Sequence, residues 1–218
     1  MIRLLSGLVL IIGIAYSSLP GAKPSATILV VGDSLSAAYG IDQEQGWVFL
    51  LQQYLQQNNS DYRVVNASIS GDTTLNALNR MQPALERHQP NIVILELGGN
   101  DGLRGLSLTE MKHNLSRMIV MSQQYNARVL LTGIQIPPNY GVRYSEAFHN
   151  IYHELASHHG IPLVPSLLKS VGDNSGLMQA DGLHPNGKAQ AIILQNVLPF
   201  LEPMLAKKQT VDIKQQNN

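Results

Sequence analysis

The feature that most constrains the fold of this chain is a regular alternation between two kinds of segment. Short runs of branched apolar residues, typical of strands buried on both faces, alternate with longer stretches whose apolar residues recur at helical three- and four-residue steps. Strands of this kind occur in parallel sheets covered by helices on both faces. The predicted strands are residues 27–31, 62–67, 92–97, 128–132 and 161–164. The predicted helices are residues 47–55, 108–125, 148–156 and 189–205.

The alternation runs from residue 27 to residue 204 without a linker, an internal repeat or a low-complexity segment. With 218 residues, 44% of them apolar, the chain is long enough for one ordinary core and short for two. We therefore expect one α/β domain at residues 27–204, a three-layer sandwich with a parallel sheet in the middle. The polar residues 205–218 are expected to form a tail.

The N-terminal residues have the pattern of an export signal. Arg3 precedes an almost wholly apolar run at residues 4–15, and small or helix-breaking residues follow at 17–22. Because the apolar run is short for a membrane span, this pattern predicts a signal peptide over residues 1–22 and no stable membrane anchor. A retained signal anchor is the alternative interpretation. We therefore expect a periplasmic or secreted protein.

Charge and cysteine content exclude several classes of function. The 15 basic and 15 acidic residues give zero formal net charge, and the basic residues are scattered, so we expect no nucleic-acid partner. The chain has no cysteine. That excludes a disulfide framework, a thiol nucleophile, thiolate metal sites and a lipoprotein anchor.

Polar, glycine-rich turns follow three of the predicted strands. These turns are residues 32–36, 68–72 and 98–101. In open parallel sheets, active sites lie just past the carboxyl ends of the strands. The sequence therefore predicts a functional site at this edge of the sheet, built from all three turns.

Ser34, in the first of these turns, is the candidate nucleophile. Gly32 lets the chain leave the strand sharply. We expect Ser34 near the start of a helix, where unpaired N–H groups and the helix dipole favour developing negative charge. A serine also needs a base to take its proton. The alternative is that Asp33 or Ser34 merely caps that helix.

His184 is the candidate base. Six of the seven histidines lie in stretches that resemble helix surfaces or helix ends, whereas His184 lies in a turn-rich loop just before the last predicted helix. Asp181, three residues earlier, can fold back to the imidazole Nδ1–H, fix its tautomer and stabilise the imidazolium. The alternative is an ordinary turn aspartate beside a surface histidine. The pattern predicts a Ser34–His184–Asp181 triad.

The same turns offer candidate donors for an oxyanion hole. The N–H groups of Ser34 and Gly71 and the side-chain amide of Asn100 can converge above the strand ends, because glycines at 98 and 99 permit an unusual turn there. Each feature alone is also explained by turn chemistry. Their occurrence at successive strand ends favours the functional interpretation.

Other catalytic signatures are absent from the sequence. There is no Gly-x-Ser-x-Gly elbow, no phosphate-binding loop and no dinucleotide glycine fingerprint. His153 and Glu154 begin a zinc-protease-like pattern, but His158 comes one residue too late for it. His149 and His153 share a helix face without an identified third ligand. We expect neither a metal ion nor a cofactor.

Taken together, the motifs resemble the four sequence blocks of the SGNH (GDSL) hydrolases, and the resemblance spans nearly the whole chain after the N-terminal segment. The blocks are Gly-Asp-Ser-Leu-Ser at 32–36, the segment around Gly71, Gly-Gly-Asn-Asp at 98–101 and Asp-x-x-His at 181–184. The resemblance implies a flavodoxin-like five-stranded parallel sheet. It also implies that Ser34 is the nucleophile, that Asp181 and His184 are its partners, and that Ser34, Gly71 and Asn100 form the oxyanion hole.

The resemblance further implies an activity and its substrate contacts. Family members hydrolyse acyl thioesters, lysophospholipids and simple or aromatic esters without a metal or cofactor. Residues 102–106 match a mobile loop that closes over the acyl chain, and residues 137–144 are a second matching segment. Gly102, Leu103 and Leu106 of the loop, together with Pro137, are therefore expected to contact the substrate. We thus expect a monomeric enzyme acting on a small acyl ester or thioester. The alternatives are an arylesterase or carbohydrate deacetylase with the same triad, and a catalytically silent lipid- or glycan-binding protein.

Overall fold

A parallel sheet forms the middle layer of the protein, whose computed structural model describes residues 26–205. Its five strands pair in the order β2-β1-β3-β4-β5, all parallel. This confirms the predicted fold class. The strands are β1 (Ala26–Gly32), β2 (Tyr62–Asn66), β3 (Ile92–Glu96), β4 (Arg128–Thr132) and β5 (Leu163–Val164).

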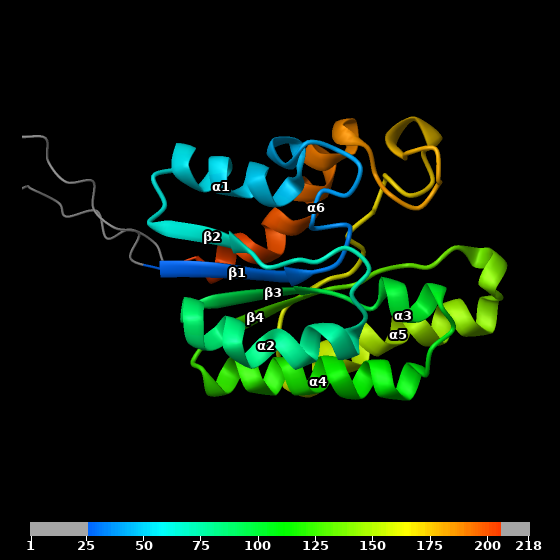
Figure 1. Ribbon diagram of the computed structural model, residues 1–218, viewed down its shortest axis with the longest axis horizontal. Coiled ribbons are helices and arrows are strands. Elements are labelled where there is room, and N and C mark those ends of the chain that lie inside the picture. Colours follow the sequence, from blue (N-terminus) through cyan, green and yellow to red (C-terminus); the bar gives the residue numbers. More distant parts are fainter. Residues whose placement is uncertain (1–25, 206–218) are drawn as a thin grey trace, which may run out of the picture.

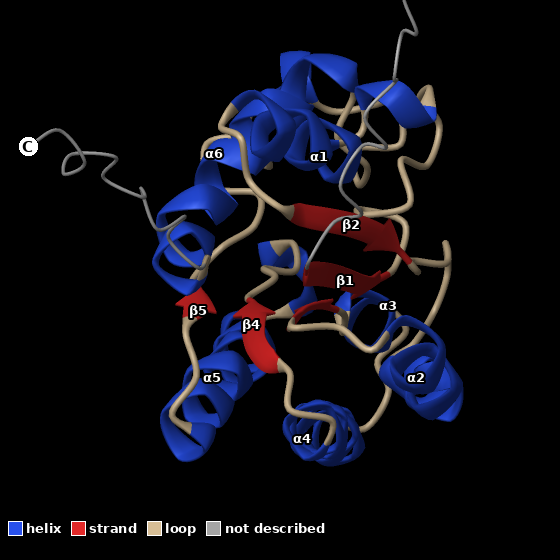
Figure 2. Cartoon of the chain, turned by 90° about the vertical axis from the view of Figure 1, so that its left-hand side faces the viewer, coloured by secondary structure: helices blue, strands red, loops and turns tan. Residues whose placement is uncertain are grey.

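Helices cover both faces of the sheet, so the strands have no solvated side (Figures 1 and 2). On β1, Ile28 and Val30 pack into the core beneath α1 (Trp47–Gln57) and α6 (Gln190–Leu201). The alternate residues Leu29 and Val31 point to the other face. That face is covered by α2 (Thr74–His88), α4 (Leu108–Gln124) and α5 (Val142–His159).

The helix predictions were incomplete. No helix was predicted over α2, although its buried residues recur at helical steps. Pro83 lies inside this helix, on its exposed side. The prediction for residues 148–156 found only the middle of α5. The remaining helical elements are α3 (Gly99–Leu103), η1 (Gln43–Gln45), η2 (Pro138–Tyr140), η3 (Ser175–Leu177), η4 (Gly187–Ala189) and η5 (Glu202–Met204).

The strand order brings the three polar turns together. Strand β1 lies between β2 and β3, so the turns that follow these strands are neighbours at the carboxyl edge of the sheet. All five residues of β3 are buried, including Glu96 at its end. A carboxyl group therefore lies in the core directly beneath the first turn.

The opposite, amino edge of the sheet holds both ends of the described chain. β1 starts at this edge, and α6 runs back toward it (Figure 1). η5 follows α6 and lies close to the end of α1, because the Tyr54 hydroxyl of α1 donates to Glu202 of η5. The predicted signal peptide lies outside the described residues, as does the predicted tail except for Leu205. The domain limits 27 and 204 stay a prediction. No helix within residues 26–205 is long and apolar enough to cross a membrane.

Candidate active site

Ser34 lies in the turn that follows β1, but the helix expected to start there does not form. Residues 33–40 make successive turns instead. One backbone bond of helical type forms, from Ala37 N–H to Asp33 O at 2.9 Å. The turn then breaks at Ala38, whose positive φ of 57° cannot continue a right-handed helix. The predicted helix start is therefore wrong, and Ser34 is presented by a tight turn.

Ser34, His184 and Asp181 lie in one hydrogen-bonded chain. His184 Nε2 lies 2.9 Å from Ser34 Oγ, and His184 Nδ1 lies 2.7 Å from Asp181 Oδ2. Asp181 Oδ1 also accepts the backbone N–H groups of Leu183 and His184 at 2.9 and 3.0 Å. These bonds, first the backbone N–H and then the imidazole of His184, lower the pKa of Asp181 to about 2. An ionised Asp181 only accepts hydrogen bonds, so Nδ1 carries the imidazole proton and Nε2 is free to accept one.

The loop that carries His184 is fixed on both sides. Gln179 N–H donates to His184 O at 2.7 Å, and the Gln179 side-chain amide donates to Tyr39 O at 2.7 Å and to Pro185 O at 3.0 Å. The Tyr39 ring lies against the imidazole, with ring centroids 4.5 Å apart. The sequence analysis missed Tyr39 because its contact with His184 joins segments that are distant in the chain.

Asn100 projects from α3, the short helix after β3, toward the turn of Ser34. Its Nδ2 donates to Asp72 O at 3.0 Å and more weakly to Asp33 Oδ2 at 3.2 Å. Gly98 makes this placement possible, because its φ is 113° and a Cβ there would lie 2.4 Å from the Tyr152 hydroxyl. An oxygen bound at Nδ2 would replace the longer bond to Asp33.

The backbone N–H groups of Ser34 and Gly71, the other two expected donors, have no acceptor among the described residues. Gly71 has a positive φ of 85°. Ser34 and Asn100 line one cavity, whereas Gly71 lies beside it. Arg104 joins the two sides, because its Nη2 donates to Gly71 O at 3.0 Å and to Asn100 Oδ1 at 3.2 Å. The sequence analysis did not identify Arg104.

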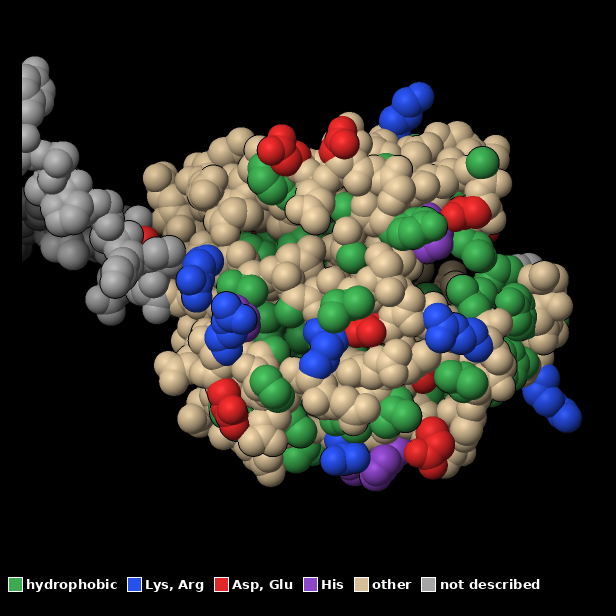
Figure 3. Space-filling view, in the orientation of Figure 1, with side chains coloured by type: hydrophobic (Ala, Val, Ile, Leu, Met, Phe, Trp, Pro, Cys, Tyr) green, Lys and Arg blue, Asp and Glu red, His purple; other side chains and the backbone are tan. Residues whose placement is uncertain are grey.

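A cavity of about 1020 Å³ opens at Ser34 and His184. In the space-filling view the carboxyl edge is hollowed beside a histidine, with hydrophobic side chains around the hollow (Figure 3). Of the predicted substrate contacts, Leu103 and Pro137 line the cavity. Gly102 and Leu106 are not among its lining residues: Gly102 packs against Phe148, which a Cβ would meet at 2.6 Å, and Leu106 is exposed.

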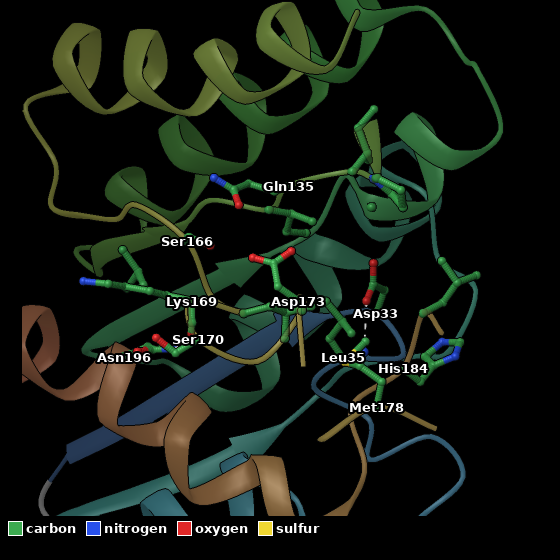
Figure 4. Close-up of a pocket in the computed structure, with 18 of the residues that line it drawn as sticks. Asp33, Leu35, Gln135, Ser166, Lys169, Ser170, Asp173, Met178, His184 and Asn196 are labelled. Atoms are coloured by element: carbon green, nitrogen blue, oxygen red, sulfur yellow. Dashed lines mark hydrogen bonds between the residues drawn. The ribbon is translucent and has the colours of Figure 1, made fainter. Parts of the chain in front are cut away.

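The walls of the cavity carry both apolar and polar side chains. The apolar ones include Leu103, Ile134, Ile136, Pro137, Leu168 and Phe200. Farther from His184, past Gln135 and Asp173, the walls carry the polar side chains labelled in Figure 4. These are Ser166, Lys169, Ser170 and Asn196.

Two buried carboxyl groups lie beneath the nucleophile. Glu96 Oε2 accepts the Ser36 hydroxyl at 2.7 Å and Asp33 N–H at 3.4 Å, while Glu96 Oε1 has no partner. Burial, reinforced by the charge of Asp33, holds the pKa of Glu96 well above its usual range. Burial likewise raises the pKa of Asp33 from 3.8 to about 6, against the hydrogen bonds from Leu35 and Asn100. The pair therefore keeps a proton at pH values where free carboxyl groups are ionised.

This proton uptake makes stability depend on pH. Between the unfolded and folded pKa values the folded state binds more protons, so the free energy of unfolding falls as the pH rises from about 4 to about 7. The shift of Asp33 from 3.8 to about 6 corresponds to about 3 kcal/mol. We expect Glu96→Gln, which keeps an oxygen acceptor and removes one titrating group, to flatten this dependence in urea unfolding at several pH values. Exposed Glu44→Gln is the control, and a Glu96→Gln profile parallel to wild type would refute the explanation.

The histidines weighed as metal ligands form only a pair. His149 Nε2 and His153 Nε2 lie 3.3 Å apart on α5. Within residues 26–205, no group of three or more His, Asp or Glu side chains is placed to hold a metal ion. Two histidines alone do not make a metal site.

The sequence of this chain is similar to a family of known hydrolases and to several characterised esterases. The model of the "GDSL-like Lipase/Acylhydrolase family" matches residues 30–192. Esterase TesA of Pseudomonas aeruginosa is 52% identical over 82% of this chain and 89% of its own length. An arylesterase of Vibrio mimicus is 44% identical over 90% and 96% of the two chains. Thioesterase 1/protease 1/lysophospholipase L1 of Escherichia coli K12 is 42% identical over 84% and 87%.

Solved structures show the same fold. The crystal structure of TesA superposes with a TM-score of 0.81 at 52% identity, covering 82% of this chain and 99% of that one. The psychrotrophic esterase EstA from Pseudoalteromonas sp., inhibited by monoethylphosphonate, superposes with a TM-score of 0.78 at 43% identity. That match covers 82% of this chain and 97% of EstA.

Proposed function

Because this chain belongs to the GDSL-like lipase/acylhydrolase family, we propose that Ser34, His184 and Asp181 are the catalytic triad of a serine esterase. The chain is a carboxylic ester or thioester hydrolase, as its esterase, arylesterase and thioesterase relatives indicate. The observation that carries the assignment is the unbroken chain of hydrogen bonds from Ser34 Oγ through the imidazole to Asp181. A lipid- or glycan-binding role would not require this arrangement.

The first half of the reaction follows from the placement of protons in this chain. His184 Nε2 takes the hydroxyl proton as Ser34 Oγ attacks the acyl carbonyl, and Asp181 stabilises the imidazolium that forms. The tetrahedral intermediate then collapses, and Nε2 gives the proton to the departing alcohol or thiol. The acyl group stays on Ser34 Oγ as an ester.

The second half repeats these roles with water. Nε2 takes a proton from water as its oxygen attacks the acyl-enzyme, and then returns that proton to Ser34 Oγ as the acid leaves. In both halves we assign the oxyanion to the N–H groups of Ser34 and Gly71 and to Asn100 Nδ2. The two free backbone N–H groups support this assignment. Preorganised donors of this kind stabilise the charge without reorganisation.

The cavity supports an acyl substrate with an apolar chain. Leu103, Ile134, Ile136 and Pro137 offer apolar surface in the cavity that opens at Ser34, and its volume of about 1020 Å³ is large enough for a chain of several carbons. We therefore propose acyl thioesters, lysophospholipids and simple esters as substrates. The arylesterase relative supports aromatic esters as the second candidate class.

A substrate panel tests this proposal. We expect kcat/KM to rise with acyl length, because each methylene group buried against the apolar wall contributes about 0.8 kcal/mol, or roughly fourfold. The measurement compares p-nitrophenyl esters of two to ten carbons, a long-chain acyl thioester, a lysophospholipid, phenyl acetate and an acetylated sugar. Preference for phenyl acetate would favour the arylesterase. Preference for the acetylated sugar, with rates falling as the acyl chain grows, would overturn the lipid-directed proposal in favour of a carbohydrate deacetylase.

We further propose that the enzyme acts in the periplasm or outside the cell, as a monomer without a membrane anchor. The support for export is the sequence of residues 1–22, with Arg3 ahead of a short apolar run. The substrate partner is a small acyl ester or thioester, in line with the names of the relatives.

A further inference from the structure

Arg104 occupies an unusual position next to the proposed oxyanion hole. It follows α3 directly, and its Nη2 donates to Gly71 O at 3.0 Å and to Asn100 Oδ1 at 3.2 Å. These two acceptors belong to two of the three residues assigned as oxyanion donors. In the described part of the chain no carboxylate lies within ion-pair distance of Arg104.

This contact helps to orient the Asn100 amide, together with the bonds from Nδ2 to Asp72 O and Asp33 Oδ2. An amide side chain has an oxygen face and an N–H face, and rotation by 180° exchanges them. Asp72 O accepts from the N–H face of Asn100, and Arg104 donates to the oxygen face. Since a guanidinium only donates and stays charged, it cannot accept from a flipped amide. Arg104 therefore holds Nδ2 on the side of Ser34.

The same guanidinium constrains the backbone at Gly71. A glycine with a φ of 85° has few steric restraints on its two peptide planes. Arg104 Nη2 holds the carbonyl of Gly71, and it is also the nearest atom to the point where a Cβ would lie, at 3.7 Å. Holding that carbonyl fixes the peptide plane between Gly71 and Asp72, whose N–H donates to Ile69 O, and so restrains one of the two peptide planes that flank Gly71. Arg104 thus contacts the Asn100 amide directly and the Gly71 donor through its neighbouring peptide.

Another arginine in the same region shows the contrast. Arg80 forms an ion pair with Asp72 and donates to Ala67 O, which ties α2 to the strand ends. Within residues 26–205 Arg104 has no such ion pair, and its hydrogen bonds go to Gly71 and Asn100. If Arg104 only packed against its neighbours, its two hydrogen bonds would not be expected to go to Gly71 and Asn100.

We propose that Arg104 is a positioning residue that preorganises the oxyanion hole by holding the Asn100 amide and the Gly71 peptide in place. The inference rests on the proposed function, because it requires Asn100 and Gly71 to act as oxyanion donors. It predicts an effect on turnover that passes through Asn100.

A double-mutant cycle tests this role on a short p-nitrophenyl ester. We expect Arg104→Ala to lower kcat about tenfold with KM changed less than about twofold, since the donors are loosened and not removed. Asn100→Ala alone should lower kcat about 10²- to 10³-fold. In the Asn100→Ala background, removing Arg104 should cost only about threefold, because residues acting through one another are not additive. Arg104→Lys should recover part of the loss, since an ammonium can reach one of the two acceptors.

The controls separate positioning from structure. Exposed Arg117 on α4 provides the matched variant, and Arg117→Ala should leave kcat and KM unchanged. Titration of reactive serine with a fluorophosphonate normalises each rate to the folded, active fraction. Equal losses from Arg104→Ala in the wild-type and Asn100→Ala backgrounds, or a raised KM with an unchanged kcat, would overturn the positioning role. A normal kcat in Asn100→Ala would instead contradict the oxyanion assignment and the proposed function.

Discussion

Ser34→Ala should lower kcat by a factor on the order of 10⁶, because the reaction then loses its covalent route and the imidazole has no hydroxyl to activate. Binding should persist, since the apolar walls around Leu103 and Ile136 are untouched. The variant should therefore bind a non-hydrolysable acyl ligand with nearly the affinity of wild type. Burst kinetics on a p-nitrophenyl ester measure the acyl-enzyme directly, and the burst should vanish in the variant.

Covalent labelling identifies the nucleophile independently of rate. A fluorophosphonate should modify wild type once, at Ser34, in keeping with the phosphonate inhibition of the related esterase EstA. Ser166 provides the matched control, because it lines the same cavity but does not contact His184. Ser166→Ala should label and turn over as wild type does. Labelling at a serine other than Ser34 would end the assignment.

Asp181→Asn should lower kcat by about 10³- to 10⁴-fold while leaving the fold intact. Asp181 uses both carboxylate oxygens, one for the imidazole and one for two backbone N–H groups. An amide has only one oxygen, and if it keeps the backbone bonds its NH₂ group faces Nδ1. The imidazole then carries its proton on Nε2, which can no longer accept the proton of Ser34.

Steady-state kinetics at several pH values measure this loss, and NMR of the imidazole nitrogens reports the tautomer. Asp173 lines the cavity without a contact to the triad, so Asp173→Asn is the matched control and should keep kcat within about twofold. Turnover of Asp181→Asn above about a tenth of wild type would contradict the role given to Asp181, even if Ser34 labels normally.

The sheet and the contact between Asp181 and His184 could be predicted from sequence because both depend on local patterns. Buried strands leave continuous apolar runs, and Asp181 reaches His184 within one turn, so three-residue spacing was sufficient. Six histidines were set aside as lying on helices or at helix ends, and they lie on α2, α4 and α5. Ser34 lies far from Asp181 and His184 in the chain, so it could be grouped with them only by expecting all of these turns at the same edge of the sheet.

What the sequence did not reveal depends on contacts between distant segments. Glu96 looks like the polar end of a strand in the sequence, and only its burial beside Asp33 and Ser36 in the structure shows that two carboxyl groups with raised pKa values lie below the nucleophile. Arg104 lies four residues after Asn100, but its contact with Gly71 requires α3 to cross the turn after β2. The helix expected at Ser34 failed because Ala38 adopts a positive φ, which no residue-type preference predicts for alanine.

The described chain begins with β1 and ends just after η5, both at the amino edge of the sheet and so at the opposite end of the strands from Ser34, and this has a practical consequence (Figure 1). A fusion partner, an affinity tag or a solid support joined at residue 26 or 205 would be attached on the side of the domain that faces away from Ser34. Substrates would then enter from the open solution while the opposite pole is tethered. Residues 26 and 205 are therefore two attachment points for oriented immobilisation of the described domain, and neither residue lines the cavity.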